Sequence, residues 1–434
     1  MIGTLPDDVL LKIFKFFVDS IYLDYTASEE WRMLVHVCQR WRNLAFTFPR
    51  HLNLQLLCRP SERSVKKMLD IWPELPIYLH DLGRPSKEAR DDVVAALRLN
   101  HRVCGIRLEM TSDSTWERLA PLMQQPFPAL THLCIHPYPP MRNVISRSFL
   151  GGSASSLRDL LLVGVPFPAL TDLLLSATNL VRLWHDSIPP SGYISPQGVV
   201  AGLAALIRLE SLSLTFYPPQ SLLGRAIRIP PPHTRTLLPA LTCLRFHGVP
   251  EYLEDLVARI DAPLLESMEI ELSHKEVLEF PQLAKFVRRA DKLSLVDRAE
   301  VSLESDRISV TLSQRLLVAR VDPKTLILKP ACHDLNVRLS ELAQSCVSCL
   351  PTPSSFECLH IHDLIHNSWQ NVTDAQWLEL LHPFNTVKDL RLSKTVAPHV
   401  AQALRGLPAD QVMEVLPALE VVFISRLKVF VIGG

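Results

Sequence analysis

The sequence predicts an α/β protein in which a small N-terminal helical unit precedes an irregular solenoid of parallel strands with helices on its outer side. Three observations predict this fold. Large apolar residues recur at helical spacing between residues 5 and 57. A short apolar motif then returns every 23 to 32 residues between residues 106 and 268. Helix-compatible stretches separate its copies. We therefore expect a helical domain over 1–58 and a repeat domain over 59–434.

The first predicted helix begins near Leu5. Thr4 can cap it, and Pro6 lies in the first turn, where a proline costs no hydrogen bond. The acidic pair at positions 7 and 8 suits the positive end of the helix dipole. Apolar residues then occupy two adjacent faces, one with Val9, Ile13 and Phe16 and the other with Leu10, Phe14 and Phe17. This helix therefore carries more apolar surface than one packing contact needs.

A second helical segment, residues 29–46, repeats the pattern. Its large apolar residues include Trp31, Leu34, Val35, Val37, Cys38, Trp41 and Leu44. A unit of this size encloses only part of its apolar surface, and an apolar patch without an internal partner usually marks an interface. We therefore expect these helices to bind another protein; the alternative is an ordinary amphipathic helical cap.

These helices resemble the F-box family. The resemblance rests on Leu5-Pro6, Leu10-Leu11, Ile13-Phe14 and Val37-Cys38-x-Arg40-Trp41-x-x-Leu44, and residues 21–28 are longer than the family's usual connection. In that family the motif docks onto the adaptor subunit of a cullin-based SCF ubiquitin ligase. The residues that the resemblance assigns to adaptor binding are Leu5, Pro6, Val9, Leu10, Ile13, Phe14, Val37, Cys38, Trp41 and Leu44.

Composition excludes several classes of function. Lys plus Arg equal Asp plus Glu at 45 each, so no basic field would attract nucleic acid. No apolar run approaches the about 18 residues needed to span a bilayer, and no secretory signal begins the chain. The nine cysteines fit reduced thiols better than a disulfide framework. We expect a protein of the cytoplasm, the nucleus or both, with no membrane partner.

The repeat is clearest in a proline-containing segment. Residues 126–133, PFPALTHL, return as PFPALTDL at 166–173, and shortened forms follow at 238–244 and 416–419. The more general unit is apolar-x-x-apolar-x-apolar, with copies at Val103/Ile106/Leu108, Leu130/Leu133/Ile135, Leu157/Leu160/Leu162, Leu209/Leu212/Leu214, Leu241/Leu244/Phe246, Leu265/Met268/Ile270, Phe356/Leu359/Ile361, Val387/Leu390/Leu392 and Leu419/Val422/Ile424, and a weaker copy at Leu180/Leu183. Such alternation predicts a short strand with one buried face.

Helix-compatible stretches lie between these copies, at 91–100, 115–124, 199–206, 252–260, 282–290, 374–381 and 397–407. Strand, turn and helix in repetition predict stacked coils whose strands are parallel. Residues 296–355 are the least regular, with possible strands at Ile308/Val310/Leu312 and at 326–328.

This part of the chain resembles leucine-rich-repeat F-box proteins, and more closely the large families of such proteins in mushroom-forming fungi. The segments that carry the closer resemblance are 69–77, 148–153, 191–196, 251–265 and 377–384. The chain departs from a regular leucine-rich repeat in lacking the Asn that normally follows the third leucine. The resemblance implies uneven repeats whose strands present one concave binding surface.

Motifs for catalysis and cofactors are absent from the sequence. We find no nucleophile elbow, no phosphate-binding Gly-rich loop and no His-Glu-x-x-His, and we expect neither enzymatic activity nor a cofactor. The best metal candidate is the set Cys346, Cys349, Cys358, His360 and His362. The last three alternate along a predicted strand and would point off its outer side, which favours surface residues over a zinc site.

The outward positions of the strands are the expected target-binding surface, because mixed charge with an exposed Trp suits protein recognition. They are His132, His136, Asp159, Arg182, Trp184, Arg245, His247, Glu269, Glu271, His360, His362, Asp389 and Arg391.

The combined prediction is a non-catalytic substrate receptor of an SCF-type ligase, with the adaptor on the helices and an unidentified target protein on the repeats. Two alternatives stay open. The chain could be an F-box interaction protein unconnected to degradation, or a metal or small-molecule sensor built on residues 346–362.

Overall fold

A computed structural model describes residues 5–21, 30–49, 51–60, 64–72, 74–81, 83, 86–110, 112–217, 234–272, 280–293, 297–303, 308–313, 325–329, 356–363, 372–406 and 415–425. The chain divides into two compact units, residues 1–193 and 194–434. The N-terminal helices and the first strands lie in the same compact unit, and the expected domain boundary after residue 58 stays a prediction.

Three helices open unit 1: α1 (Asp7–Ile21), α2 (Arg32–Val37) and α3 (Gln39–Thr47). Leu10 and Phe14 of α1 are fully buried, and the Phe14 ring packs 4.7 Å from the ring of Trp41 in α3. The Arg40 guanidinium bonds the Asp7 carboxylate at 2.6 Å and the Leu5 carbonyl at 2.6 Å. An apolar contact and a charged one therefore hold α1 against α3.

The N-terminal helices also pack on the first coil of the repeat. Trp31 donates from its indole nitrogen to the Gln55 carbonyl at 2.9 Å, and its ring lies edge-on to Trp72 at 5.4 Å. The Phe46 ring and the Arg32 guanidinium contact the same Trp72 at 6.2 and 5.0 Å. One side of the helical group is thus closed against its own chain.

The strands of unit 1 form a parallel sheet in chain order, each pairing with the next. They are β1 (Leu56–Cys58), β2 (Ile77–Asp81), β3 (Val103–Met110), β4 (His132–Pro137), β5 (Asp159–Val163) and β6 (Arg182–Ile188). The sequence motif predicts β3 to β6 correctly and misses β1 and β2. Leu133, Leu160 and Leu183 stand in register across neighbouring strands and are at most 1% exposed.

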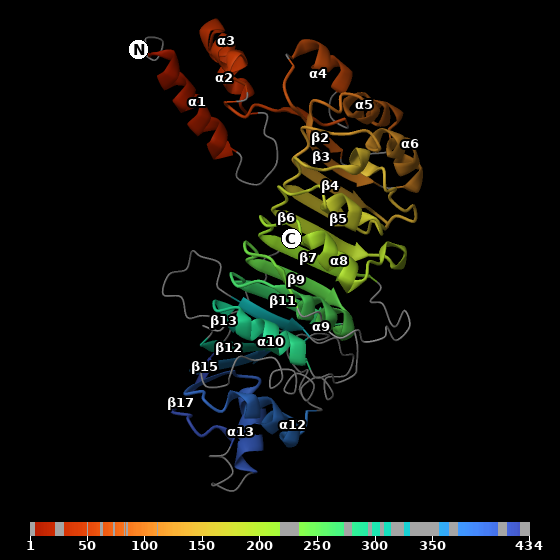
Figure 1. Cartoon of the computed structure of the whole chain (residues 1–434). Coiled ribbons are helices and arrows are strands. Elements are labelled where there is room, and N and C mark those ends of the chain that lie inside the picture. Colours follow the sequence, from red (N-terminus) through yellow and green to blue (C-terminus); the bar gives the residue numbers. More distant parts are fainter. Residues whose placement is uncertain are drawn as a thin grey trace. The chain divides into compact units, whose positions relative to one another are not determined.

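Helices cover one side of these strands (Figure 1). They are α4 (Val65–Ile71), α5 (Lys87–Leu97), α6 (Asp113–Met123), the 3-10 turns η2 (Phe149–Gly152) and η3 (Pro190–Gly192), and the short α7 (Leu170–Leu174). Ser86 caps α5 by accepting from the Ala89 amide at 3.0 Å. The buried Asp92 carboxylate accepts from the Val65 amide at 2.9 Å and so ties α5 to the start of α4.

The main sheet of unit 2 runs in the order β7-β9-β11-β14-β13-β12-β15-β16-β17. Its strands are β7 (Ser211–Phe216), β9 (Cys243–Gly248), β11 (Ser267–Leu272), β12 (Arg298–Leu303), β13 (Ile308–Ser313), β14 (Thr325–Lys329), β15 (Cys358–Asp363), β16 (Asp389–Ser393) and β17 (Val421–Ser425), while β8 (Thr236–Leu237) and β10 (Ile260–Asp261) form a separate parallel pair.

A fully parallel sheet is the wrong expectation for unit 2. Strand β13 runs antiparallel to both of its neighbours, β12 and β14, and chain order and spatial order differ there. The inward residues still form a continuous row, in which Leu326, Leu312 and Ala299 stand opposite one another and all are at most 1% exposed. The reversal is tolerated because alternation, and not strand direction, decides which side chains reach the core.

The helices of unit 2 are α8 (Pro196–Leu203), α9 (Pro250–Arg259), α10 (Pro281–Arg289), α12 (Asp374–Leu381), η6 (His382–Phe384) and α13 (Ala397–Arg405). The Glu254 carboxylate in α9 accepts from the first amides of α10 at 2.9 and 2.8 Å, and Thr373 and Gln376 form a capping box at α12. Across the described ranges of both units, none of the helices combines the length and the apolar character that crossing a bilayer requires.

Threonine hydroxyls join neighbouring coils through hydrogen bonds to backbone carbonyls. Thr131 donates to the Cys104 carbonyl at 2.9 Å, Thr242 to the Glu210 carbonyl at 3.1 Å and Thr386 to the Phe356 carbonyl at 3.2 Å. Each bond joins one coil to the coil before it and satisfies a carbonyl at the strand entrance. The described fold is therefore α/β with a mostly parallel sheet, in keeping with a leucine-rich-repeat-like solenoid.

Candidate functional site

The helices α1 and α2 expose large apolar side chains. Phe16 is 78% exposed, Met33 64%, Val37 59% and Ile13 45%. Each belongs to the helical group, whose other side is closed by Trp72. These four side chains are the candidate partner surface of the helical group, since contiguous exposed apolar patches mark interaction sites.

The ten residues assigned to adaptor binding fall into three groups. Pro6, Ile13, Val37 and Cys38 are exposed, and Leu5, Val9 and Trp41 are half-buried. Leu10, Phe14 and Leu44 are buried inside the chain, so these three hold the helices together instead of meeting a partner directly. Phe16 and Met33, which are outside these ten residues, are more exposed than Val37 and Ile13. The sequence already indicates Phe16, because it lies on one of the two apolar faces of the first predicted helix.

A charged row crosses the outer face of the unit 1 sheet. Tyr78, Gly105, His132, Asp159 and Arg182 stand side by side on successive strands. Asp159 pairs with Nε2 of His132 at 3.0 Å and also with Arg182. Burial alone would raise the pKa of Asp159, but hydrogen bonds from His132 and Arg182 outweigh it and lower the pKa. These three predicted target-binding residues are thus brought together, and they are half-buried by one another.

A second row lies two residues further along the same strands. It contains Arg107, Cys134 and Trp184, and Arg107 pairs with Glu109 at 3.0 Å. Trp184 is 37% exposed and His136 is also exposed, which agrees with their predicted outward positions. Burial raises the pKa of the Cys134 thiol to about 11 and that of the Tyr78 hydroxyl to about 12.

His185 is a polar residue on the inner side of the unit 1 sheet. His185 is fully buried and its Nε2 lies 2.9 Å from the Val165 carbonyl oxygen. Burial lowers the pKa of His185 to about 4 despite this hydrogen bond, which favours the charged form. His185 is therefore a neutral core residue.

In unit 2 the outer face carries a matching group around Glu269. Arg245 bonds the Glu269 carboxylate at 2.8 Å and Lys329 bonds it at 2.5 Å. Burial would raise the pKa of Glu269, but Lys329 and Arg245 together lower it. Arg245 is exposed, and His247 and Glu271 are half-buried on the same strands. Lys329, on a strand whose register the sequence leaves open, completes the group.

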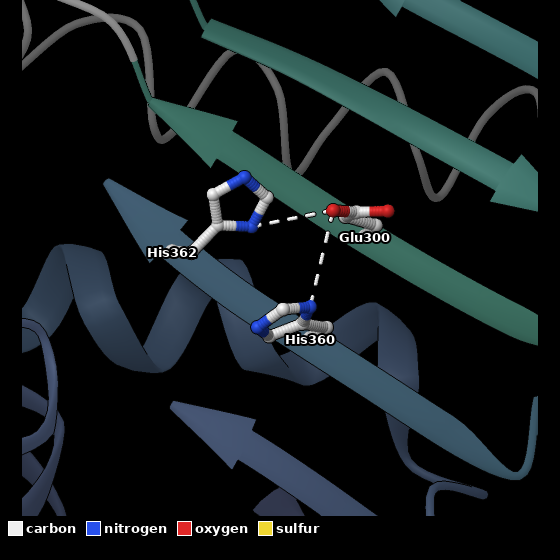
Figure 2. A group of neighbouring side chains, drawn as sticks. All are labelled: Glu300, His360 and His362. Atoms are coloured by element: carbon white, nitrogen blue, oxygen red, sulfur yellow. Dashed lines mark ion pairs between the residues drawn. The ribbon is translucent and has the colours of Figure 1, made fainter. Parts of the chain in front are cut away.

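A histidine pair and a glutamate meet on the outer face of β12 and β15. Glu300 of β12 stands opposite His360 of β15, and its Oε1 lies 3.8 Å from Nδ1 of His360 and 3.4 Å from Nδ1 of His362 (Figure 2). The two imidazole rings lie 4.8 Å apart. Burial, reinforced by His362, lowers the pKa of His360 although Glu300 opposes the shift. His362 is only 5% exposed, so its predicted outward position does not make it accessible to a large partner.

The sequence-based metal set and this cluster differ. Cys346 and Cys349 lie outside the described residues, and Cys358, which is buried as a free thiol, is not part of the cluster. In this cluster the third candidate metal ligand is the Glu300 carboxylate and not a cysteine thiol. In the sequence, the outward position of Glu300 is indicated only by its inward neighbours, Ala299 and Val301. Two alternating apolar residues are too few to predict a strand.

A charged pocket of about 150 Å³ lies where β12, β15, β16 and β17 begin. Arg298, Asp389 and Arg391 contribute to its lining, so two further predicted target-binding residues share one site. The Arg391 guanidinium lies 5.2 Å from the centre of the Phe423 ring. This stacking holds a planar cation at the rim of the pocket.

No protein-family model matches the chain, and no curated protein is similar enough in sequence to be recognised as a relative. Among solved structures, the chain is similar to the leucine-rich repeat-containing protein LegL7 from Legionella pneumophila, at 11% identity and a TM-score of 0.27 over 86% of this chain and 91% of that one.

Proposed function

We propose that this protein is the substrate-recognition subunit of an SCF-type ubiquitin ligase, acting in the cytoplasm, the nucleus or both. In this proposal α1 to α3 dock onto the ligase adaptor, and the outer strand faces hold a target protein. The protein does no bond chemistry; it raises the effective concentration of the target near the ubiquitin-loading subunits.

The observation that carries the proposal is the exposure of Ile13, Phe16, Met33 and Val37 on a helical group whose sequence resembles an F-box. The contacts of Trp31, Phe46 and Arg32 with Trp72 support it from the other side. They fix the helices on the repeat domain, so that an adaptor and a target bound to the two parts would be held in one assembly.

The structure also decides which substitutions test docking. Replacing Leu10 or Phe14 by Asp would place a charge in the interior and unfold the helical group. A triple variant Ile13→Asp, Phe16→Asp and Val37→Asp changes exposed positions instead. Each apolar side chain contributes roughly 1.5–3 kcal/mol when buried in an interface, so we expect adaptor affinity to fall by about three decades.

The control is a double variant, Ile71→Asp and Leu175→Asp, at positions that are 75% and 59% exposed in the same compact unit. Adaptor binding is measured by titration with purified adaptor, and cullin association by co-purification. The proposal fails if the full-length protein does not bind the adaptor, or if the triple variant binds it as tightly as the control does.

The alternative of an interaction protein without a role in degradation makes a different prediction. In that case the adaptor still binds, but no protein captured by the strand faces accumulates when this chain is depleted. Measuring the abundance of captured proteins after depletion therefore separates the two functions.

A further inference from the structure

The group formed by Glu300, His360 and His362 has the composition and spacing of a metal site. Two histidines at positions i and i+2 of one strand point to the same side of the sheet, and Glu300 stands opposite the first of them on the neighbouring strand. Their ligand atoms all lie within 4.8 Å of one another. Two imidazoles and one carboxylate are a known catalytic-type ligand set for zinc, with a fourth position open.

The interatomic distances are close to what a tetrahedral ion needs. Ligand bonds of about 2.0–2.1 Å place the ligand atoms of a tetrahedron about 3.3 Å apart. The Glu300 Oε1 to His362 Nδ1 distance is 3.4 Å, and the distance to His360 Nδ1 is 3.8 Å. All three ligand atoms lie within 4.8 Å of one another, so a side-chain rotation at His360 has to bring its ligand nitrogen closer to both partners to complete the three-ligand geometry.

An unpaired ring nitrogen points to the same conclusion. Nδ1 of His362, the nitrogen that faces Glu300, is buried and has no hydrogen-bond partner among the described residues. Nε2 of His362 lies 3.1 Å from the Ser302 hydroxyl. When Nε2 donates to Ser302, Nδ1 presents its lone pair to the Glu300 carboxylate, and two acceptors then face each other. A cation between them removes that repulsion, and a second-shell partner such as Ser302 is what fixes a metal-binding histidine.

Arg298 and Arg391 are the groups that oppose a cation here, since both lie close enough to influence His360 electrostatically. The pocket that these arginines line also contains a third cation, Lys388, and the cations there are offset by four carboxylates, those of Asp297, Glu357, Asp389 and Glu420. Because the positive and negative charges around the site offset one another, the Glu300 carboxylate remains available to bind a divalent cation.

We propose that Glu300, His360 and His362 bind a zinc-class divalent cation on the outer strand face of unit 2, with one coordination position open. The donor set of nitrogen and oxygen favours zinc over calcium or magnesium. The open position would accept water or a side chain of a bound protein. This site does not depend on adaptor docking, so either proposal can fail alone.

The test uses the full chain, stripped with a chelator and titrated with Zn²⁺ by calorimetry. We expect one site that is lost in His360→Asn and weakened more than about 10-fold in Glu300→Gln, because losing a ligand exceeds the 10–100-fold effect of losing a second-shell partner. Two matched controls in the same unit, His382→Asn and Glu251→Gln, change exposed residues and should bind Zn²⁺ as the unaltered protein does.

Cobalt separates this site from the thiols. Co²⁺ bound by imidazole and carboxylate gives ligand-field absorption without a thiolate charge-transfer band, whereas cysteine ligands add that band. Absence of Zn²⁺ binding, unchanged binding in both Glu300→Gln and His360→Asn, or loss only in Cys346→Ser/Cys349→Ser would each overturn the proposal. Glu300 is half-exposed, so its isosteric variant remains informative even if His360→Asn does not fold.

Discussion

The strands β2 to β6 of unit 1 and the strands β11 to β15 of unit 2 solve the same packing problem in two ways. In unit 1 each strand pairs with the next one in the chain, and all pairs are parallel. In unit 2 the chain passes from β11 to β12, yet β11 pairs with β14 and β12 pairs with β15. A sheet of this kind therefore does not require each strand to pair with the next strand in the chain.

What both regions share is the row of inward side chains. Leu133, Leu160 and Leu183 form it in unit 1. In unit 2 the row passes through Leu326, Leu312 and Ala299, of which Leu312 lies on the reversed strand. Alternation with period two keeps this row intact in either direction. The irregular region is also where Glu300 meets two histidines, because the reordering brings β12 beside β15.

The largest expected difference between the two regions concerns core truncation. Leu160 has a leucine on each side in register, whereas Leu312 has Ala299 on one side. Both leucines are at most 1% exposed. We expect Leu160→Ala to lower the free energy of unfolding by about 3–5 kcal/mol and Leu312→Ala by about 2–3 kcal/mol. Urea unfolding followed by hydrogen exchange in each unit measures both; equal losses would show that the smaller neighbour does not lower the cost.

The second comparison concerns the pH dependence that the fully buried His185 gives to unit 1. His185 has a pKa lowered to about 4 in the folded state by burial, against about 6.5 when unfolded. The unfolded chain therefore takes up a proton below pH 6.5 that the folded chain takes up only near pH 4. The contribution to stability is complete above pH 6.5 and is lost as the pH falls through this interval, at about 1.4 kcal/mol per pH unit and about 3 kcal/mol in all.

The variant His185→Gln keeps a side-chain donor for the Val165 carbonyl and removes the titration. We expect the free energy of unfolding of unit 1 to change less between pH 6.5 and 4 in this variant than in the unaltered protein. Hydrogen-exchange protection of β5 and β6, measured across that interval, reports it. The same slope in both proteins would contradict the assignment.

The sequence alone predicts the regular coils because each repeats one apolar spacing. The motif at Leu130/Leu133/Ile135 gives β4 and its outward residues correctly, and the expected helix over 374–381 coincides with α12. The same rule fails for β1 and β2, and for β12, where Ala299 and Val301 are the only described inward residues and no leading apolar residue announces the strand. Glu300 is missed for that reason.

The sequence also does not predict which side chains of different coils contact one another. Spacing puts Asp159 and Glu269 on outer faces, but the partners that half-bury them lie one or more coils away, at His132 and Arg182 for the first and at Lys329 for the second. Likewise, Leu10 and Phe14 are equivalent to Ile13 and Phe16 in apolar character. Only the position of α3 decides which pair is buried.

The smallest expected effect concerns two glycines that let aromatic rings lie across the sheet. A Cβ on Gly105 would lie 2.2 Å from Cδ2 of Tyr78, whereas one on Gly248 would lie 2.9 Å from Cδ2 of Phe216. We expect Gly105→Ala to cost about 1–3 kcal/mol, as overpacking does, and Gly248→Ala to cost less. In a Tyr78→Ala background the Gly105 substitution should cost at least about 0.5 kcal/mol less, because contacting residues couple. Thermal unfolding of the four proteins in this cycle measures the coupling. If the two substitutions are additive, the Tyr78 ring and the added methyl group do not interact, and the cost of Gly105→Ala does not come from the close approach of that ring.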